Sequence, residues 1–111
     1  MSHDTIFAQC SKPGKCGVNI FRISGPHSIN ILHELSGHKK ITPRYMHYTK
    51  LWTHNKDIID KAMVCYFKGP ESFTGDDVVE IYTHGSIAIA KMLTEAVLRQ
   101  EYVRLAEPGE F

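Results

Sequence analysis

Apolar residues recur along the chain with two different periods, and the period separates predicted strands from predicted helices. Short runs rich in β-branched and aromatic residues predict strands, in which alternate side chains share a face. Longer segments with apolar positions three and four residues apart predict helices. The predicted strands are 5–10, 18–24, 47–53, 57–67, 76–84 and 102–106. The predicted helices are 24–37 and 86–100.

Residues that favour helix ends support both helices. Pro26 suits the first turn of the first helix, and Gly37 is placed to end it. Ser86 is a candidate N-cap for the second helix. Because strands and helices interleave around a predicted strand pair at 47–67, we expect an α+β (α/β-like) fold, a mixed β-sheet with flanking helices. Residues 1–111 are expected to form one domain, since no linker, repeat or low-complexity tract interrupts them.

Two predicted strands each carry one charged residue on an otherwise apolar face. Alternation along the strand places Arg22 on the face of Ile20, and it places Glu80 on the face of Val78 and Tyr82. An isolated buried charge is costly, so each of these groups needs a partner. Two interpretations remain open: a structural ion pair or charges facing water, and a pocket in which the two groups orient a ligand.

The chemistry of a ligand follows from the two groups. A carboxylate accepts two parallel N–H bonds, which suits a flat heterocycle with adjacent ring N–H and amino donors. An arginine can donate two parallel N–H bonds to a carboxylate or carbonyl group of a ligand. His84, Gly85 and Ser86 stand where strand meets helix. They either form only the turn from strand to helix, with Ser86 as the N-cap, or they form a helix N-terminus whose free N–H groups bind an anionic or carbonyl group of a ligand.

Composition narrows the function classes. The formal net charge is +1 without a basic patch, so this segment alone lacks the electrostatic footprint of a nucleic-acid-binding surface. Three cysteines without C-x-x-C spacing favour reduced thiols and a cytoplasmic location, and Cys65 is expected to be a small buried residue. The sequence has no run of eighteen apolar residues and no recognisable secretory signal, so we expect no membrane association.

Several catalytic and metal-binding motifs fail on spacing. In "HELSGH" the histidines His33 and His38 are five residues apart with Gly37 between them, whereas zinc-protease helices place them four apart. The glycine-rich "KPGKCG" lacks the P-loop spacing, and no nucleophile elbow occurs. We therefore expect neither metal ligands nor catalytic residues in this segment.

Three separated stretches together resemble a known family. "DTIFAQCSKPGKCGVNIFRISGP", "ESFTGDDVVEIYTHGS" and "RLAEPGEF" are similar, in order and spacing, to the N-terminal domain of the MnmE (TrmE) tRNA-modification GTPases. The resemblance extends from about Asp4 to Phe111. "FTGDDVVE" followed by "HG" is its most specific part.

The resemblance implies a fold like the tetrahydrofolate-binding domain of glycine-cleavage T-proteins. It implies a homodimerisation module that binds 5-formyl- or 5,10-methylene-tetrahydrofolate as a one-carbon donor. The whole family protein works with MnmG, a partner that uses FAD and NADH, to build aminomethyl-type groups on C5 of the wobble uridine of certain tRNAs. A separate GTPase domain hydrolyses GTP with potassium and magnesium. This segment alone is expected to carry out neither reaction.

By resemblance, Arg22 in "FRISG" and Glu80 in "DVVE" match the folate-contacting arginine and glutamate of the family. The resemblance also indicates that four neighbours shape the pocket or its turn: Phe73, Thr74, Gly75 and His84. The loop "GKCGVNI" departs from the usual "GRGGIGI", because Cys16 and Asn19 replace glycines while Lys15 keeps the charge.

The sequence stops at Phe111, where the family continues with a basic segment, a further folate contact and the helical and GTPase domains. We therefore expect one domain of a longer protein, with part of the folate site outside it. An alternative is a purely structural dimerisation module with a vestigial pocket, which the changed loop favours and the retention of Arg22 and Glu80 disfavours. A third, less favoured, is an enzyme of the T-protein type.

Overall fold

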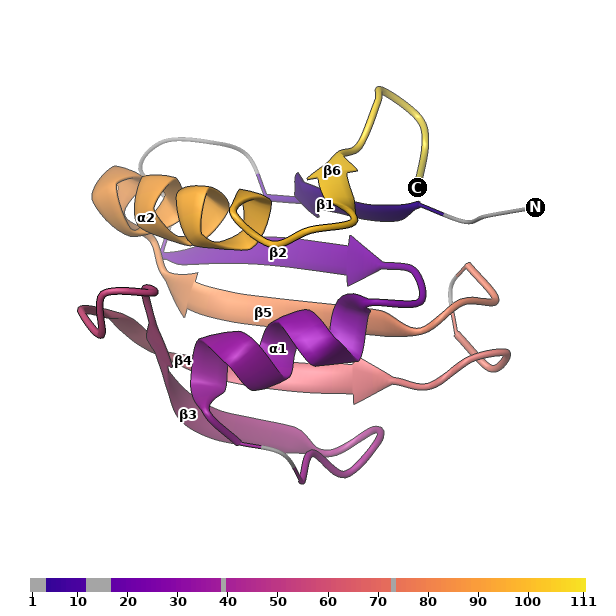
Figure 1. The fold of residues 1–111 in the computed structure, drawn as a ribbon, viewed down its shortest axis with the longest axis horizontal. Coiled ribbons are helices and arrows are strands. Elements are labelled where there is room, and N and C mark those ends of the chain that lie inside the picture. Colours follow the sequence, from indigo (N-terminus) through magenta and orange to yellow (C-terminus); the bar gives the residue numbers. More distant parts are fainter. Residues whose placement is uncertain (1–3, 12–16, 39, 73) are drawn as a thin grey trace.

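The computed structural model describes residues 4–11, 17–38, 40–72 and 74–111, and within them six strands and two helices form the fold (Figure 1). The strands are β1 (Thr5–Gln9), β2 (Val18–Ser24), β3 (Met46–Trp52), β4 (Ile58–Phe67), β5 (Val78–His84) and β6 (Val103–Leu105). The helices are α1 (Ser28–Ser36) and α2 (Ile87–Leu98). All eight predicted segments are confirmed. Neither helix, within the described residues, is long and apolar enough to cross a membrane.

The start of α1 differs from the prediction. The helix begins at Ser28, so Pro26 lies in the turn that precedes it. Gly25 makes this turn at φ 139°, its N–H donates to the Asp77 carbonyl, and the Ser28 hydroxyl donates to the Gly25 carbonyl. A side chain at Gly25 would place its Cβ 2.6 Å from the Thr5 Cα. The close approach of β1 therefore fixes where the helix can begin.

The six strands form one mixed sheet in the order β3-β4-β5-β2-β1-β6, in which only the β1–β6 pair is parallel. Both helices lie on the same face of this sheet (Figure 1). The core lies between the helices and that face, and its largest fully buried side chains include Phe7, Phe21, Leu32, Ile81 and Leu93. The domain is thus a two-layer α+β fold, as predicted.

Among the described residues, no helix covers the opposite face, which we call the open face. It carries Val18, Met46, Tyr48 and Met63, all large apolar or aromatic side chains that are between 38% and 58% exposed. Large exposed apolar patches of this kind mark interaction surfaces in soluble proteins. The two charged strand residues lie on this face and not in the helix-covered core.

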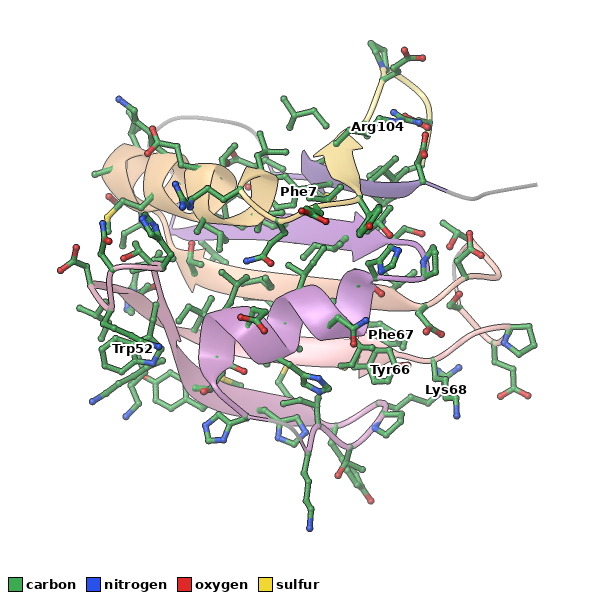
Figure 2. The ribbon with its side chains drawn as sticks, in the orientation of Figure 1. Phe7, Trp52, Tyr66, Phe67, Lys68 and Arg104 are labelled. Atoms are coloured by element: carbon green, nitrogen blue, oxygen red, sulfur yellow. The ribbon has the colours of Figure 1, made fainter. Side chains whose placement is uncertain are left out.

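An ion-pair network, the Arg104 clasp, holds the last residues against β1 and β6 (Figure 2). Arg104 Nε donates to Asp4 Oδ2 at 3.0 Å, and its two Nη atoms donate to the two carboxylate oxygens of Glu110 at 2.8 and 2.5 Å. The Ala106 N–H also donates to the Phe7 carbonyl. The segment after β6 is therefore fixed to the first strand of the chain.

The clasp predicts an acid-dependent loss of stability. Hydrogen bonds from Arg104, followed by one from the Glu107 N–H, lower the pKa of Glu110 to about 2. Because the folded-state pKa lies below the unfolded value, the stabilisation is complete above about pH 4.5 and is lost as the pH falls toward 2. In urea unfolding, Glu110→Gln is expected to be less stable than the wild type at pH 6, with a difference that shrinks toward pH 2.

Glu101→Gln is the matched control for this prediction, because Glu101 is an exposed glutamate outside the clasp. Its stability difference from the wild type is expected to stay small over the same pH range. A Glu110→Gln difference that is constant from pH 6 to pH 2 would contradict the proposed electrostatic contribution.

Candidate functional site

The two charged strand residues are direct neighbours in the sheet. β2 and β5 are antiparallel with Arg22 opposite Glu80 in the register. Arg22 Nη2 and Nε donate to Glu80 Oε2 at 2.5 and 3.1 Å. The Glu80 side chain is 7% exposed and that of Arg22 is 25% exposed. The structure therefore forms the ion pair that strand alternation left open, in the two central strands of the sheet.

Tyr82 provides a second partner for the carboxylate. Its hydroxyl donates to Glu80 Oε1 at 2.5 Å, while Arg22 occupies Oε2. Burial, followed by the hydrogen bond to Glu80, raises the pKa of Tyr82 to about 12, so the phenol remains a donor at neutral pH. Alternation predicted that Tyr82 shares the face of Glu80, but not that its hydroxyl reaches the carboxylate.

Small side chains flank the ion pair on the two neighbouring strands, so that four paired residues form a row across the open face. Ala8 opposes Arg22 on β1, and Cys65 opposes Glu80 on β4. Cys65 is buried, as predicted. Burial, and then the negative charge of Glu80, raise the pKa of its thiol, so it is held as an uncharged group beside the carboxylate. Small neighbours on both sides leave the ion pair as the most polar feature of the row.

The other residues expected around the pocket do not all gather there. The Thr74 hydroxyl lies 2.8 Å from that of Ser24, two residues beyond Arg22 on the same face of β2. Gly75 adopts φ 83° in the adjoining loop, and Phe73 lies outside the described residues. His84 is four residues from Glu80 along β5, about 13 Å away, and its Nδ1 pairs with Asp60. His84 therefore belongs to the turn and not to the ion pair.

Asn19 has a role that sequence reasoning did not assign. It is 1% exposed, and its Nδ2 donates to the carbonyls of His84 and Ser86 at 3.2 and 2.9 Å. The Ser86 hydroxyl in turn accepts from the Ile89 N–H, which confirms the predicted N-cap. Replacement of a family glycine by Asn19 was the available signal. This side chain joins β2 to the turn that starts α2, whereas Lys15 and Cys16 lie outside the described residues.

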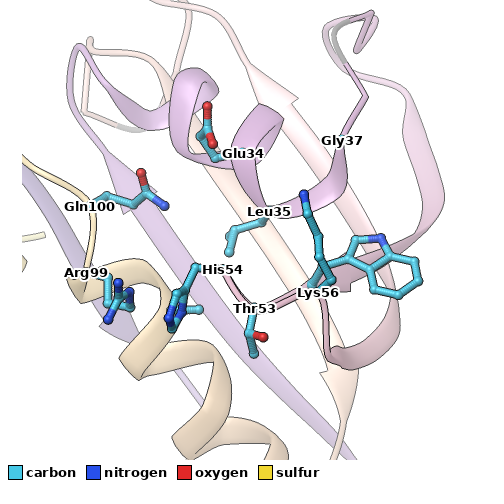
Figure 3. A pocket seen from close by; sticks show the side chains of 10 residues that line it. Glu34, Leu35, Gly37, Thr53, His54, Lys56, Arg99 and Gln100 are labelled. Carbon is cyan, nitrogen blue, oxygen red and sulfur yellow. The ribbon is translucent and has the colours of Figure 1, made fainter.

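A separate cavity of about 510 Å³ lies on the helix side, where the C-terminal ends of α1 and α2 meet the turn between β3 and β4 (Figure 3). Side chains of both charge signs line it, among them Glu34, Lys56 and Arg99. Neither Arg22 nor Glu80 is among its lining residues. Because it shares no residue with the ion pair, it is distinct from the site on the open face.

The open-face site has the chemistry to recognise a ligand that carries N–H donors. A carboxylate held away from water by one cation and one phenol can accept N–H donors strongly, because the surrounding dielectric is low. Within the described residues no group of three or more histidine, cysteine, aspartate or glutamate side chains is arranged to hold a metal ion. A ligand that reaches Glu80 must bring hydrogen-bond donors of its own, because an ionised carboxylate can only accept.

Comparison with known proteins gives consistent matches. Residues 5–111 match the family described as the N-terminus of the GTP-binding protein TrmE. The tRNA modification GTPase MnmE of Orientia tsutsugamushi (strain Boryong) is 54% identical over 112 residues, which cover 100% of this chain and 25% of that protein. Those of Rickettsia bellii (strain OSU 85-389) and Rickettsia rickettsii (strain Sheila Smith) are 57% and 55% identical, covering 97% of this chain and 24% of each relative.

Proposed function

The chain belongs to the family of TrmE N-termini, and we propose that it is the tetrahydrofolate-binding and homodimerisation domain of a tRNA-modification GTPase. The family match confirms the resemblance carried by its three motifs. The chain spans about a quarter of the length of its matched relatives, so the activity of a whole protein is part of the proposal.

The observation that carries folate binding is a carboxylate withdrawn from water on the uncovered face of a sheet. Glu80 and Arg22 face each other there, and Glu80 is 7% exposed. Charges removed from water in this way are costly to maintain, and a pair of apolar residues would stabilise the sheet at least as well. A pterin offers adjacent ring N–H and amino donors to a carboxylate, which gives the pair a purpose beyond stability.

Homodimerisation is supported by the open face itself. Val18, Met46, Tyr48 and Met63 are exposed on the same face as the ion pair. A second copy that covers this surface would bury these side chains and lower the dielectric around Glu80. Folate binding and dimerisation would then use adjoining parts of the same face, which is why we propose them together.

For the whole protein we propose modification of C5 of the wobble uridine in tRNA. A folate-bound one-carbon unit would be supplied at this domain, and an FAD-dependent partner of the MnmG type would act with it. GTP, potassium and magnesium would be needed in a GTPase domain elsewhere in that protein. A cytoplasmic location agrees with the substrates of such a reaction.

The proposal is tested by titrating the chain with 5-formyltetrahydrofolate in a calorimeter and by measuring its mass by analytical ultracentrifugation. We expect saturable binding, and a dimer whose dissociation depends on concentration. p-Aminobenzoylglutamate, which lacks the pterin, is the control ligand and is expected not to bind. A folded dimer that binds neither compound would instead support the purely structural module.

A further inference from the structure

The Glu80 carboxylate is hydrogen-bonded by Tyr82 of its own strand, and we infer that Tyr82 is a gate residue, whose hydroxyl occupies one of the two acceptor positions that the paired N–H donors of the ligand take. Tyr82 leaves this position when the ligand enters, and it thereby sets ligand affinity. The inference rests on the proposed folate binding, because it concerns access to the same carboxylate. It assigns to Tyr82 a role that neither the family match nor the motifs assign.

The first observation is how the carboxylate is occupied. A carboxylate has roughly four acceptor positions. Arg22 uses Oε2 twice and Tyr82 uses Oε1 once. With its side chain only 7% exposed, Glu80 has little surface that a ligand could reach directly. One acceptor position on Oε1 remains, so a flat ligand with two adjacent donors can bind fully only if one of the side chains already bound to Glu80 moves.

The second observation decides which side chain moves. Arg22 is held by two charge-assisted bonds, and its departure would leave a carboxylate without its counter-charge. Tyr82 is held to Glu80 by one bond. Removing Tyr82 leaves the ion pair intact, so its displacement costs less than that of Arg22.

The third observation is space for the displaced ring. A cavity of about 220 Å³ borders Tyr82 on the open face. Val18, Tyr48, Lys61 and Met63 are among its lining residues. This volume lies on the side of Tyr82 away from Arg22, since its lining residues Val18 and His84 oppose each other two positions beyond Tyr82, whereas Arg22 opposes Glu80 two positions before it. The ring can turn toward this cavity without disturbing the helix-covered core.

Replacement of the Tyr82 hydroxyl by a ligand N–H at Glu80 has a measurable effect on ligand affinity. In the wild type, a ligand N–H replaces the phenol on Oε1, so part of the binding free energy is offset by the bond that breaks. Without the phenol, the ligand makes a new bond to an oxygen that lacks a partner. Removal of the hydroxyl is therefore expected to strengthen binding while it weakens the ligand-free fold.

Tyr82→Phe tests this inference, with 5-formyltetrahydrofolate as the probe in calorimetry. We expect about tenfold tighter binding than in the wild type, together with a lower midpoint of urea unfolding without ligand. Tyr48→Phe is the matched control, because Tyr48 lines the same cavity, whereas the hydroxyl that donates to Glu80 Oε1 is that of Tyr82. Its affinity is expected to equal that of the wild type.

The remaining outcomes separate this inference from the proposed function. If the wild type binds and Tyr82→Phe binds equally or more weakly, Tyr82 is only a structural support and the gate is overturned while folate binding stands. If neither protein binds although both are folded, folate binding fails and the gate fails with it. Binding by Tyr82→Phe alone would support a gate that is closed in the wild type.

Discussion

Replacement of Glu80 by alanine is expected to weaken binding of 5-formyltetrahydrofolate by about a hundredfold or more, because two charge-assisted hydrogen bonds to the pterin are lost. The same change is expected to lower the free energy of unfolding by about 2 to 3 kcal/mol, since it removes the carboxylate to which the Arg22 guanidinium is bonded. The cost is below that of a fully buried pair because the Arg22 side chain keeps a quarter of its surface in water. Calorimetry and urea unfolding measure the two effects.

A double variant separates loss of the ligand site from loss of the fold. Arg22→Met with Glu80→Leu replaces the ion pair by apolar side chains, which is expected to restore the wild-type stability but none of the binding. Equal folate affinity in the wild type and in Glu80→Ala would show that the pair has no part in recognition. If Glu80→Ala loses stability but the wild type does not bind folate, the Arg22–Glu80 pair contributes only to the fold.

The second large effect concerns the core beneath the site. Phe21→Ala is expected to lower the free energy of unfolding by about 4 kcal/mol, because it leaves a cavity in a close-packed interior. Phe21 is 0% exposed, and its ring stacks on that of Phe7 with the centroids 5.7 Å apart. Phe21 also immediately precedes Arg22 in β2, so the backbone that carries the site would lose its support on the core side.

Tyr45→Ala is the matched control for this substitution, since it also removes an aromatic ring but from a side chain that is 66% exposed. It is expected to change the free energy of unfolding by about 0.5 kcal/mol or less. Urea unfolding followed by circular dichroism gives both values. A Phe21→Ala loss no larger than that of Tyr45→Ala would mean that the interior around Phe21 collapses to fill the space.

The strands and helices could be predicted because apolar periodicity and the residues at element ends indicate the same elements. Apolar periodicity identified the strands and helices, and Gly37 ends α1 in the left-handed conformation as expected. The error at Pro26 has a non-local cause. The turn at Gly25 is set by its contact with Thr5, twenty residues earlier in the sequence, and helix-start signals near Pro26 contain no information about that contact.

Strand alternation could predict which residues of the site share a face of a strand, but not how they contact one another. Alternation placed Arg22 and Glu80 on apolar faces, but it could not show that the face is the one that the helices leave uncovered. Their direct opposition depends on the register between β2 and β5, which are separated by more than fifty residues. The contact of Tyr82 with Glu80 depends in turn on side-chain rotamers, which periodicity does not determine.

The parallel pairing of β1 with β6 has a consequence for synthesis on the ribosome. β1 is among the first segments made, yet its outer edge pairs with a strand that ends at Leu105. At bacterial or eukaryotic rates of translation, roughly 5 to 20 seconds separate the two strands. During that interval the nascent sheet presents an unpaired edge to other chains, and edges of this kind promote aggregation. Once β6 has formed, an edge strand of three residues replaces the five-residue edge of β1, and short edge strands limit pairing with other chains.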